Sequence, residues 1–280
     1  MTNRTTHDSD RRTSQAPRAS LAAELRALHV PGTPAVLPNA WDAASARTVA
    51  AAGFPAVATG SAAMAPALGY EDHEATPPGE MFAALARIVR AVDVPVTADL
   101  ERGYGLAPAE LAARLAESGA VGCNLEDTDP RTGKLLDVRE QADFLAAFRQ
   151  AAPDVVINAR VDTFLHGSGE GTGSGAEASR LAEAVARGRA YAGAGADCVY
   201  PISVSGLSDR AVRSLVEGIG APVNVAYGPG SPLSFEELAA AGVARVTFGP
   251  GLFVAVQQHL AGLVEAIREG RDPYAGTALG

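Results

Sequence analysis

Two acidic residues follow a short apolar run in the stretch Val94–Gly105. Asp99 and Glu101 stand at the end of a run that contains Val94, Val96 and Thr97, and a Gly-Tyr-Gly turn follows them. A β-branched run bounded in this way is typical of a buried strand that emerges at a loop. Carboxylates at such a position are the ligands that hard divalent cations prefer. The sequence therefore predicts a metal site here.

Other polar residues stand at the ends of further apolar runs. Arg160 and Glu126 each end such a run, and the turn Thr59-Gly60-Ser61 ends another. Asp72 follows in a loop and could accept a proton or bind a substrate. The tight turn offers N–H groups and hydroxyls to a carboxylate or enolate oxygen, although it could also be an ordinary turn.

Several carboxylates are expected to crowd together at these run ends. Asp99, Glu101, Glu126 and Asp127 would repel one another unless a cation neutralised them. Mg²⁺ is the expected cation; the alternative is a structural network that includes Arg102 and Arg160. Arg160 could pair with Glu126 or Asp162, or clamp a substrate carboxylate or phosphonate in two-pronged fashion.

The chain alternates between short apolar runs and Ala-rich helical patterns. Eight strands alternating with helices predict a closed (β/α)₈ barrel of the TIM type in a single domain spanning residues 20–280, with an open doubly wound sheet as the alternative. Residues 250–270 predict an extra C-terminal helix, which either packs on its own barrel or is swapped between subunits. The expected strands are Ala35–Leu37, Ala56–Thr59, Pro95–Asp99, Val121–Glu126, Val155–Arg160, Asp197–Pro201, Pro222–Ala226 and Arg245–Gly249.

The composition excludes several classes of partner. The formal net charge is −9, which argues against binding to nucleic acid or an anionic membrane surface, and no run is long enough to span a membrane. Residues 1–19 are polar and predict a disordered extension, not a secretory signal. Cys123 and Cys198 lack CxxC spacing and are expected to be reduced, so we expect a cytoplasmic protein with a small-molecule partner.

Five motifs together resemble the isocitrate lyase/phosphoenolpyruvate mutase superfamily. The resemblance covers about residues 35–255, with the motifs in order and at the separations of that family. The motifs are Pro38-Asn-Ala-Trp-Asp, Ala58-Thr-Gly-Ser with Leu68-Gly-Tyr-Glu-Asp, Asp99-Leu-Glu-Arg-Gly-Tyr-Gly, Asn124-Leu-Glu-Asp and Asn158-Ala-Arg-Val-Asp.

The resemblance implies a Mg²⁺-dependent barrel, with Mn²⁺ as an alternative ion, that acts on 2-oxo acids or their enolates. It also implies a homo-oligomer, a tetramer or a dimer, whose last helix is exchanged between subunits. By position, the metal residues are Asp99, Glu101 and Glu126, the catalytic residues are Arg160, Asp72 and Glu126, and the substrate-binding residues are Thr59, Gly60, Ser61, Asp99, Arg160 and Asn224.

Two departures from the lyase pattern bear on the reaction. The loop after the fourth strand, Thr128–Asp137, has neither the Cys nor the His of the family's lyases, and Asn224-Val-Ala-Tyr replaces the motif that binds their second product. Isocitrate-type cleavage is therefore not expected. We expect a decarboxylase-like or lyase-like enzyme that cleaves or forms a C–C or C–P bond through an enolate.

Two alternatives remain open at this point. One is phosphonate chemistry at the same core site, either phosphonopyruvate hydrolysis or phosphoenolpyruvate mutase-type C–P bond formation. The other is a non-catalytic barrel that binds a dicarboxylate. The short loop could close over the site with Arg131 or Lys134.

Overall fold

The computed structural model describes residues 18–166, 174–204 and 206–275. Most of the predicted N-terminal extension therefore lies outside the described residues. Helix α1 begins at Arg18 and ends at Ala27, so the last two residues of the expected extension are already helical.

Nine parallel strand segments of the described residues form the predicted eight-stranded barrel, because β1 and β2 together make its first strand. One sheet runs in the order β2-β3-β4-β5-β8-β9 and the other in the order β1-β11-β10. A parallel bridge between Val199 and Val223 joins β9 to β10, and Pro38 links β1 directly to β2 along the chain. The ring is closed, which confirms the barrel. The barrel strands are β1 (Ala35–Leu37), β2 (Asn39–Ala40), β3 (Val57–Thr59), β4 (Val96–Asp99), β5 (Gly122–Glu126), β8 (Val156–Val161), β9 (Cys198–Pro201), β10 (Asn224–Ala226) and β11 (Arg245–Thr247).

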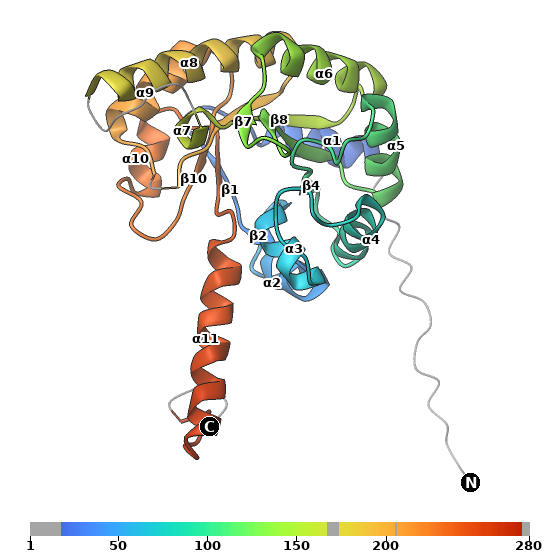
Figure 1. The fold of residues 1–280 in the computed structure, drawn as a ribbon, viewed down its shortest axis with the longest axis vertical. Coiled ribbons are helices and arrows are strands. Elements are labelled where there is room, and N and C mark those ends of the chain that lie inside the picture. The colour runs from blue at the N-terminus through green and yellow to red at the C-terminus, as the bar shows by residue number, and fades with distance from the viewer. Residues whose placement is uncertain (1–17, 167–173, 205, 276–280) are drawn as a thin grey trace.

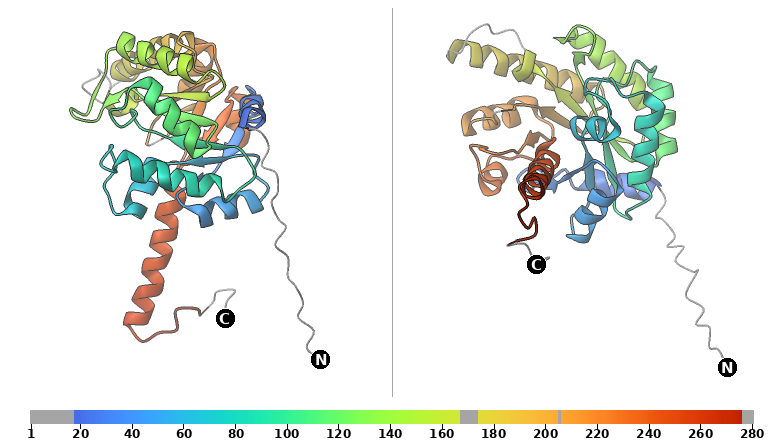
Figure 2. Two further views of the ribbon diagram at one scale, coloured as in Figure 1. Left: turned by 90° about the vertical axis from the view of Figure 1, so that its right-hand side faces the viewer. Right: turned by 60° about the horizontal axis from the view of Figure 1, so that its bottom comes forward.

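Helices surround the barrel and lie between consecutive strands (Figures 1 and 2). Their inner faces bury a continuous apolar core against the strands, as a half-buried amphipathic helix requires. These helices are α2 (Ala43–Ala51), α4 (Pro78–Val89), α5 (Pro108–Ser118), α6 (Val138–Ala151), α8 (Ser174–Gly193), α9 (Asp209–Ile219) and α10 (Phe235–Ala240).

The structure adds elements that the sequence analysis did not predict. Helix α3 (Ser61–Leu68) starts directly at the end of β3, and helix α7 (Thr163–His166) follows β8. The loop after β5 is a hairpin of β6 (Thr128–Asp129) and β7 (Lys134–Leu135). All three elements lie after the carboxyl ends of strands, where a barrel of this type forms its site.

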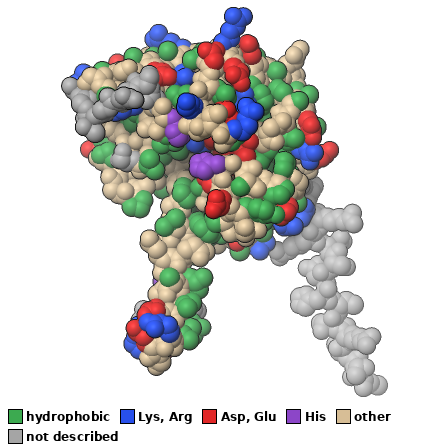
Figure 3. All heavy atoms as spheres, in the orientation of Figure 1, with side chains coloured by type: hydrophobic (Ala, Val, Ile, Leu, Met, Phe, Trp, Pro, Cys, Tyr) green, Lys and Arg blue, Asp and Glu red, His purple; other side chains and the backbone are tan. Residues whose placement is uncertain are grey.

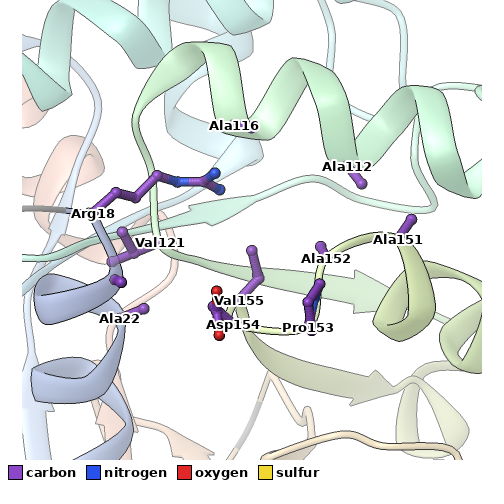
Figure 4. A pocket seen from close by; sticks show the side chains of 11 residues that line it. Arg18, Ala22, Ala112, Ala116, Val121, Ala151, Ala152, Pro153, Asp154 and Val155 are labelled. Atoms are coloured by element: carbon purple, nitrogen blue, oxygen red, sulfur yellow. The ribbon is translucent and has the colours of Figure 1, made fainter.

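Helix α1 closes the amino-terminal end of the barrel. Leu25 is fully buried among inward-facing residues of β1, β3 and β8. Gly122 on β5 leaves room for it, because a Cβ there would lie 2.6 Å from the Leu25 side chain. At the edge of this plug, Arg18 donates to the carbonyl of Ala120 and points toward α5 across a groove of about 210 Å³ (Figure 4).

Helix α11 (Gly251–Arg268) projects away from the barrel (Figures 1 and 2). Its contacts with the body are made at its start, where Phe253 packs edge-on against Trp41. Apolar side chains nevertheless continue along the projecting column (Figure 3). The exposed ones include Leu252, Val254, Val256, Leu260, Val264 and Ile267. Among the described residues, no helix is long and apolar enough to cross a membrane.

The packing of α1 against the end of the barrel predicts the effects of two substitutions on stability. Leu25→Ala should lower the free energy of unfolding by about 3 kcal/mol, because it opens a cavity in a fully buried site. Leu28→Ala, directly after the end of the same helix and partly exposed, should cost less than about half of that. Urea unfolding followed by circular dichroism measures both; equal losses would show that α1 does not seal the barrel.

Candidate active site

Asp99, at the end of β4, has one carboxylate oxygen held and the other unpaired. The backbone N–H and the hydroxyl of Ser61 donate to Asp99 Oδ2 at 3.0 and 3.1 Å. The Thr59 hydroxyl accepts from the Asp99 N–H at 3.0 Å. Asp99 Oδ1 is buried and has no hydrogen-bond partner among the described residues. A buried acceptor left in this state is costly unless a ligand completes it.

The turn at Thr59 to Ser61 is fixed by an asparagine from the first strand. Asn39 donates to the Thr59 carbonyl at 2.7 Å and accepts from the Phe248 N–H at 2.7 Å. The exits of β2, β3 and β11 are thereby tied together. Gly60 is buried in this junction, and a Cβ there would lie 3.4 Å from the Asn39 amide nitrogen. The turn and Asp99 therefore form one rigid unit.

Glu101 is buried and is held by two neighbours. The Tyr104 hydroxyl donates to Glu101 Oε1 at 2.8 Å, and the Glu74 N–H donates to Glu101 Oε2 at 2.6 Å. In return, the Glu74 carboxylate accepts from the Tyr104 N–H at 2.5 Å. Glu74, Glu101 and Tyr104 all have positive φ, as does His73. Non-glycine residues rarely adopt this backbone conformation, so the loops carry strain at the site.

The acids around Asp99 affect one another electrostatically. Burial, and then the charges of Asp99 and Asp72, raise the pKa of Glu101 to about 8. Asp72 is half-buried, and its Oδ1 has no hydrogen-bond partner among the described residues. The structure therefore brings Asp72 and Glu101 within electrostatic reach of each other, as a shared site requires.

Glu126 and Arg160 form a buried ion pair at the ends of β5 and β8. Arg160 Nη1 lies 2.5 Å from Glu126 Oε2, and the same guanidinium donates to Asp162 at 2.7 and 2.9 Å. Burial raises the pKa of Glu126, while Arg160 opposes that rise. Arg160 therefore pairs with both Glu126 and Asp162, which the sequence predicted as alternative partners.

Asp127 is held by groups of α8 and by the backbone of Asp162. It accepts from the Tyr191 hydroxyl at 2.7 Å, from Arg187 at 3.1 Å and from the Asp162 N–H at 2.9 Å. Arg187 and Tyr191 belong to α8, a helix whose sequence pattern did not single them out. Asp127 therefore anchors α8 to the barrel and is saturated by protein groups.

Two further predicted residues have different surroundings. Arg102 stacks on the Phe144 ring at 4.0 Å, and the acids whose charges act on it most strongly are Glu140 and Glu74. Asn224 is fully buried and exchanges hydrogen bonds with the Thr247 hydroxyl at 3.2 and 3.3 Å. It lies inside the barrel below the strand ends, and its role in substrate binding stays a prediction.

The donors present fit a magnesium ion. No group of three or more His, Cys, Asp or Glu side chains in the described part of the chain is arranged to hold a metal. Mg²⁺, however, is usually bound by only one or two carboxylates, with water and substrate oxygens as its remaining ligands. Asp99, with its unpartnered oxygen and with Glu101 and Glu126 within electrostatic reach, meets that requirement.

Comparison with known proteins identifies the family. A family model described as phosphoenolpyruvate phosphomutase matches residues 25–268. The chain belongs to this family. It is 34% identical to an uncharacterized protein of Mycobacterium tuberculosis H37Rv over 254 residues, which cover 89% of this chain and 92% of that protein.

Solved structures place the chain in the phosphoenolpyruvate mutase/isocitrate lyase superfamily. A candidate phosphonomutase of Burkholderia cenocepacia J2315 is 43% identical, with a TM-score of 0.81 over 89% of this chain and 99% of that one. A 2,3-dimethylmalate lyase of the superfamily is 27% identical, with a TM-score of 0.73 over 89% and 87% of the two chains. The predicted family resemblance is confirmed.

The raised pKa of Glu101 predicts a pH dependence of stability in the metal-free protein. The unfolded chain releases this proton near a pKa of 4.5 and the folded protein only near 8. Between these values the folded state holds the extra proton, so stability falls as pH rises. In EDTA, the free energy of unfolding of the parent protein should therefore fall between pH 5.5 and 7.5. Glu101→Gln should make this fall smaller by about 2 kcal/mol.

Urea unfolding at the two pH values measures this difference. The same pH dependence in the variant and the parent protein would contradict the assignment of the raised pKa to Glu101.

Proposed function

We propose that the protein is a Mg²⁺-dependent enzyme that cleaves or forms a C–C bond in a small 2-oxo acid through an enolate, in the manner of a decarboxylase or lyase. The observation that carries this proposal is the buried, unpartnered Oδ1 of Asp99 beside the turn at Thr59 to Ser61. In this proposal, that oxygen binds the metal and the turn beside it binds an anionic oxygen of the substrate.

In this proposal Asp99, Glu101 and Glu126 hold the ion, Mg²⁺ or alternatively Mn²⁺. The bound ion supplies Lewis-acid polarisation of the substrate oxygens. Ser61 donates both its N–H and its hydroxyl to Asp99, so the turn keeps this carboxylate oriented with its second oxygen unpaired. Preorganisation of this kind lowers the cost of binding at the moment of reaction.

Arg160 binds the carboxylate end of the substrate. Its guanidinium is neutralised by Glu126 and Asp162, and its side chain is only 14% exposed. These acids fix the guanidinium plane, which a two-pronged carboxylate contact requires. Asp72, whose Oδ1 is buried and unpartnered, is the group we assign to proton transfer at the developing enolate.

A second candidate is phosphonate chemistry on the same core. The 43% identity with the B. cenocepacia candidate phosphonomutase favours it. A phosphonopyruvate substrate would present the same 2-oxo acid end to Thr59, Gly60, Ser61 and Arg160, and only the bond at C3 would differ. The two candidates must therefore be separated by products.

Turnover assays with Mg²⁺ test the proposal directly. Pyruvate release from oxaloacetate or 2-methylmalate supports C–C chemistry, and formation of pyruvate or phosphoenolpyruvate from phosphonopyruvate supports the second candidate. If oxalate binds but none of these substrates reacts, the barrel is a binding protein and both enzyme proposals fail.

The metal assignment predicts the effect of one substitution. Asp99→Asn should weaken Mg²⁺-dependent oxalate binding, measured by calorimetry, by about two orders of magnitude, because it removes a ligand charge. Asp143→Asn, at an exposed position of α6, is the matched control and should bind as the parent protein does. Oxalate affinity that is the same with and without Mg²⁺ would refute the metal site.

We also propose that the protein is a homo-oligomer, a dimer or tetramer, in which α11 packs on a second copy. The apolar stripe of α11 is exposed along its length. Beside its base lies an apolar groove of about 680 Å³ between α2 and α11, lined by Trp41, Val49, Leu252 and Val256. A helix of this length with an uncovered apolar face is typical of an interface.

A double substitution on that stripe tests the assembly. Val256→Asp with Leu260→Asp should convert the oligomer to a monomer in sedimentation velocity, because charges cannot be buried in an apolar interface. Gln257→Asp with Gln258→Asp adds the same charge to neighbouring positions of the helix. An unchanged sedimentation coefficient in the first variant would exclude α11 from the interface.

A further inference from the structure

Arg245 is the largest fully buried side chain of the described residues and lies in β11. Its exposed fraction is 1%, and its Nε and Nη1 have no hydrogen-bond partner among the described residues. The ion pairs found in the described part of the chain do not include it. Burial of a guanidinium without a partner costs folding free energy, so we expect Arg245 to have a role in function that offsets this cost.

The register of the strands shows that Arg245 faces the barrel interior. Its Cα partners are Ala35 on β1 and Asn224 on β10. Two residues further on, Thr247 meets the Asn224 side chain inside the barrel. Because side chains two apart on a strand share a face, Arg245 points inward below Thr247.

The electrostatic neighbours of Arg245 come from strands that do not pair with β11. They include Cys198 and Tyr200 on β9 and Asp99 on β4. A side chain that reaches groups on these strands must extend toward the barrel axis. The guanidinium therefore lies beneath the acids of the site and interacts with Asp99 through the interior.

The charges around it explain why a fixed cation is useful there. Asp99, Glu101, Glu126 and Asp162 are four carboxylates, and Arg160 and Arg245 are the two guanidinium groups among them. Arg160 is engaged by Glu126 and Asp162. Arg245 alone has no acid of its own, so its charge acts on whatever occupies the Asp99 site.

We propose that Arg245 is a positioning residue that weakens cation binding at Asp99 and strengthens binding of the anionic substrate and its enolate above it. This inference rests on the proposed function, since it assumes a divalent cation and an anionic ligand at Asp99. A positive charge in a low-dielectric interior repels the metal and attracts the anion at the same time.

The test measures two affinities in Arg245→Met, with Mg²⁺ alone and with oxalate at saturating Mg²⁺, by calorimetry. Loss of the charge should make Mg²⁺ bind about tenfold more tightly and oxalate about tenfold more weakly. Arg245→Lys keeps the charge and should restore both affinities toward those of the parent protein. A purely structural role would weaken both affinities together.

Arg149→Met provides the control for structural damage. Arg149 is a partly buried arginine that pairs with Asp197 and binds backbone carbonyls at the other end of the barrel. Its loss should lower the melting temperature without opposite changes in the two affinities.

The outcomes separate this inference from the proposed function. If Arg245→Met is folded and both affinities are unchanged or both fall, the inference is overturned while wild-type turnover still supports the function. If the opposite changes occur but no substrate reacts, the function fails and the role of Arg245 stands. If Mg²⁺ does not bind the parent protein, both fail. If Arg245→Met and Arg245→Gln both fail to fold, Arg245 is structural and the inference is overturned.

Discussion

The burial of several carboxylates at one end of the barrel is the constraint on which the site depends. Each ionised acid taken out of water must gain hydrogen bonds or an opposite charge, or its pKa rises until it is neutral. The Tyr104 hydroxyl and the Glu74 N–H donate to Glu101, and Glu126 forms an ion pair with Arg160. Arg187 and Tyr191 donate to Asp127. Asp99 and Asp72 each keep a buried oxygen without a hydrogen-bond partner among the described residues. The other acids are satisfied by protein groups, and these two oxygens remain as acceptors.

The barrel supplies the rigidity that such an arrangement needs. Cα pairing sets Asp99 beside Asn124 and Glu126 beside Arg160, so the strand register alone fixes these separations. The loops then add what the strands cannot. Glu101 and Tyr104 sit in left-handed backbone conformations that bring their side chains together. Strain of this kind persists only when the surrounding structure holds it, here through the reciprocal contacts with Glu74.

The sequence was sufficient for features that have a period or a repeated position. The strand and helix alternation predicted the closed barrel, and the polar residues at strand ends predicted which side chains would meet. Three-dimensional partners carried no such signal. Arg187 lies in an Ala-rich helix, 60 residues from the Asp127 that it binds, and nothing local marks it. Arg245 looks like an ordinary strand residue until the register shows that it points inward. Helix α3 escaped prediction because it begins without a polar N-cap side chain and contains Pro66.

Residues other than those that bind the shared part of the substrate must select between C–C and C–P chemistry. In the proposed function, Asp99, the turn at Thr59 to Ser61 and Arg160 all bind the 2-oxo acid end, which both substrates share. The loops after the other strands offer two groups that differ in kind. One is the β6–β7 hairpin, where Arg131 is 87% exposed and pairs with Asp129. Another is the aromatic cluster of Tyr227, Phe235 and Phe248 after β10 and β11. An apolar wall suits a carbon substituent and gives a phosphonate dianion no counter-charge, so the cluster favours C–C chemistry unless Arg131 leaves Asp129 when the hairpin closes.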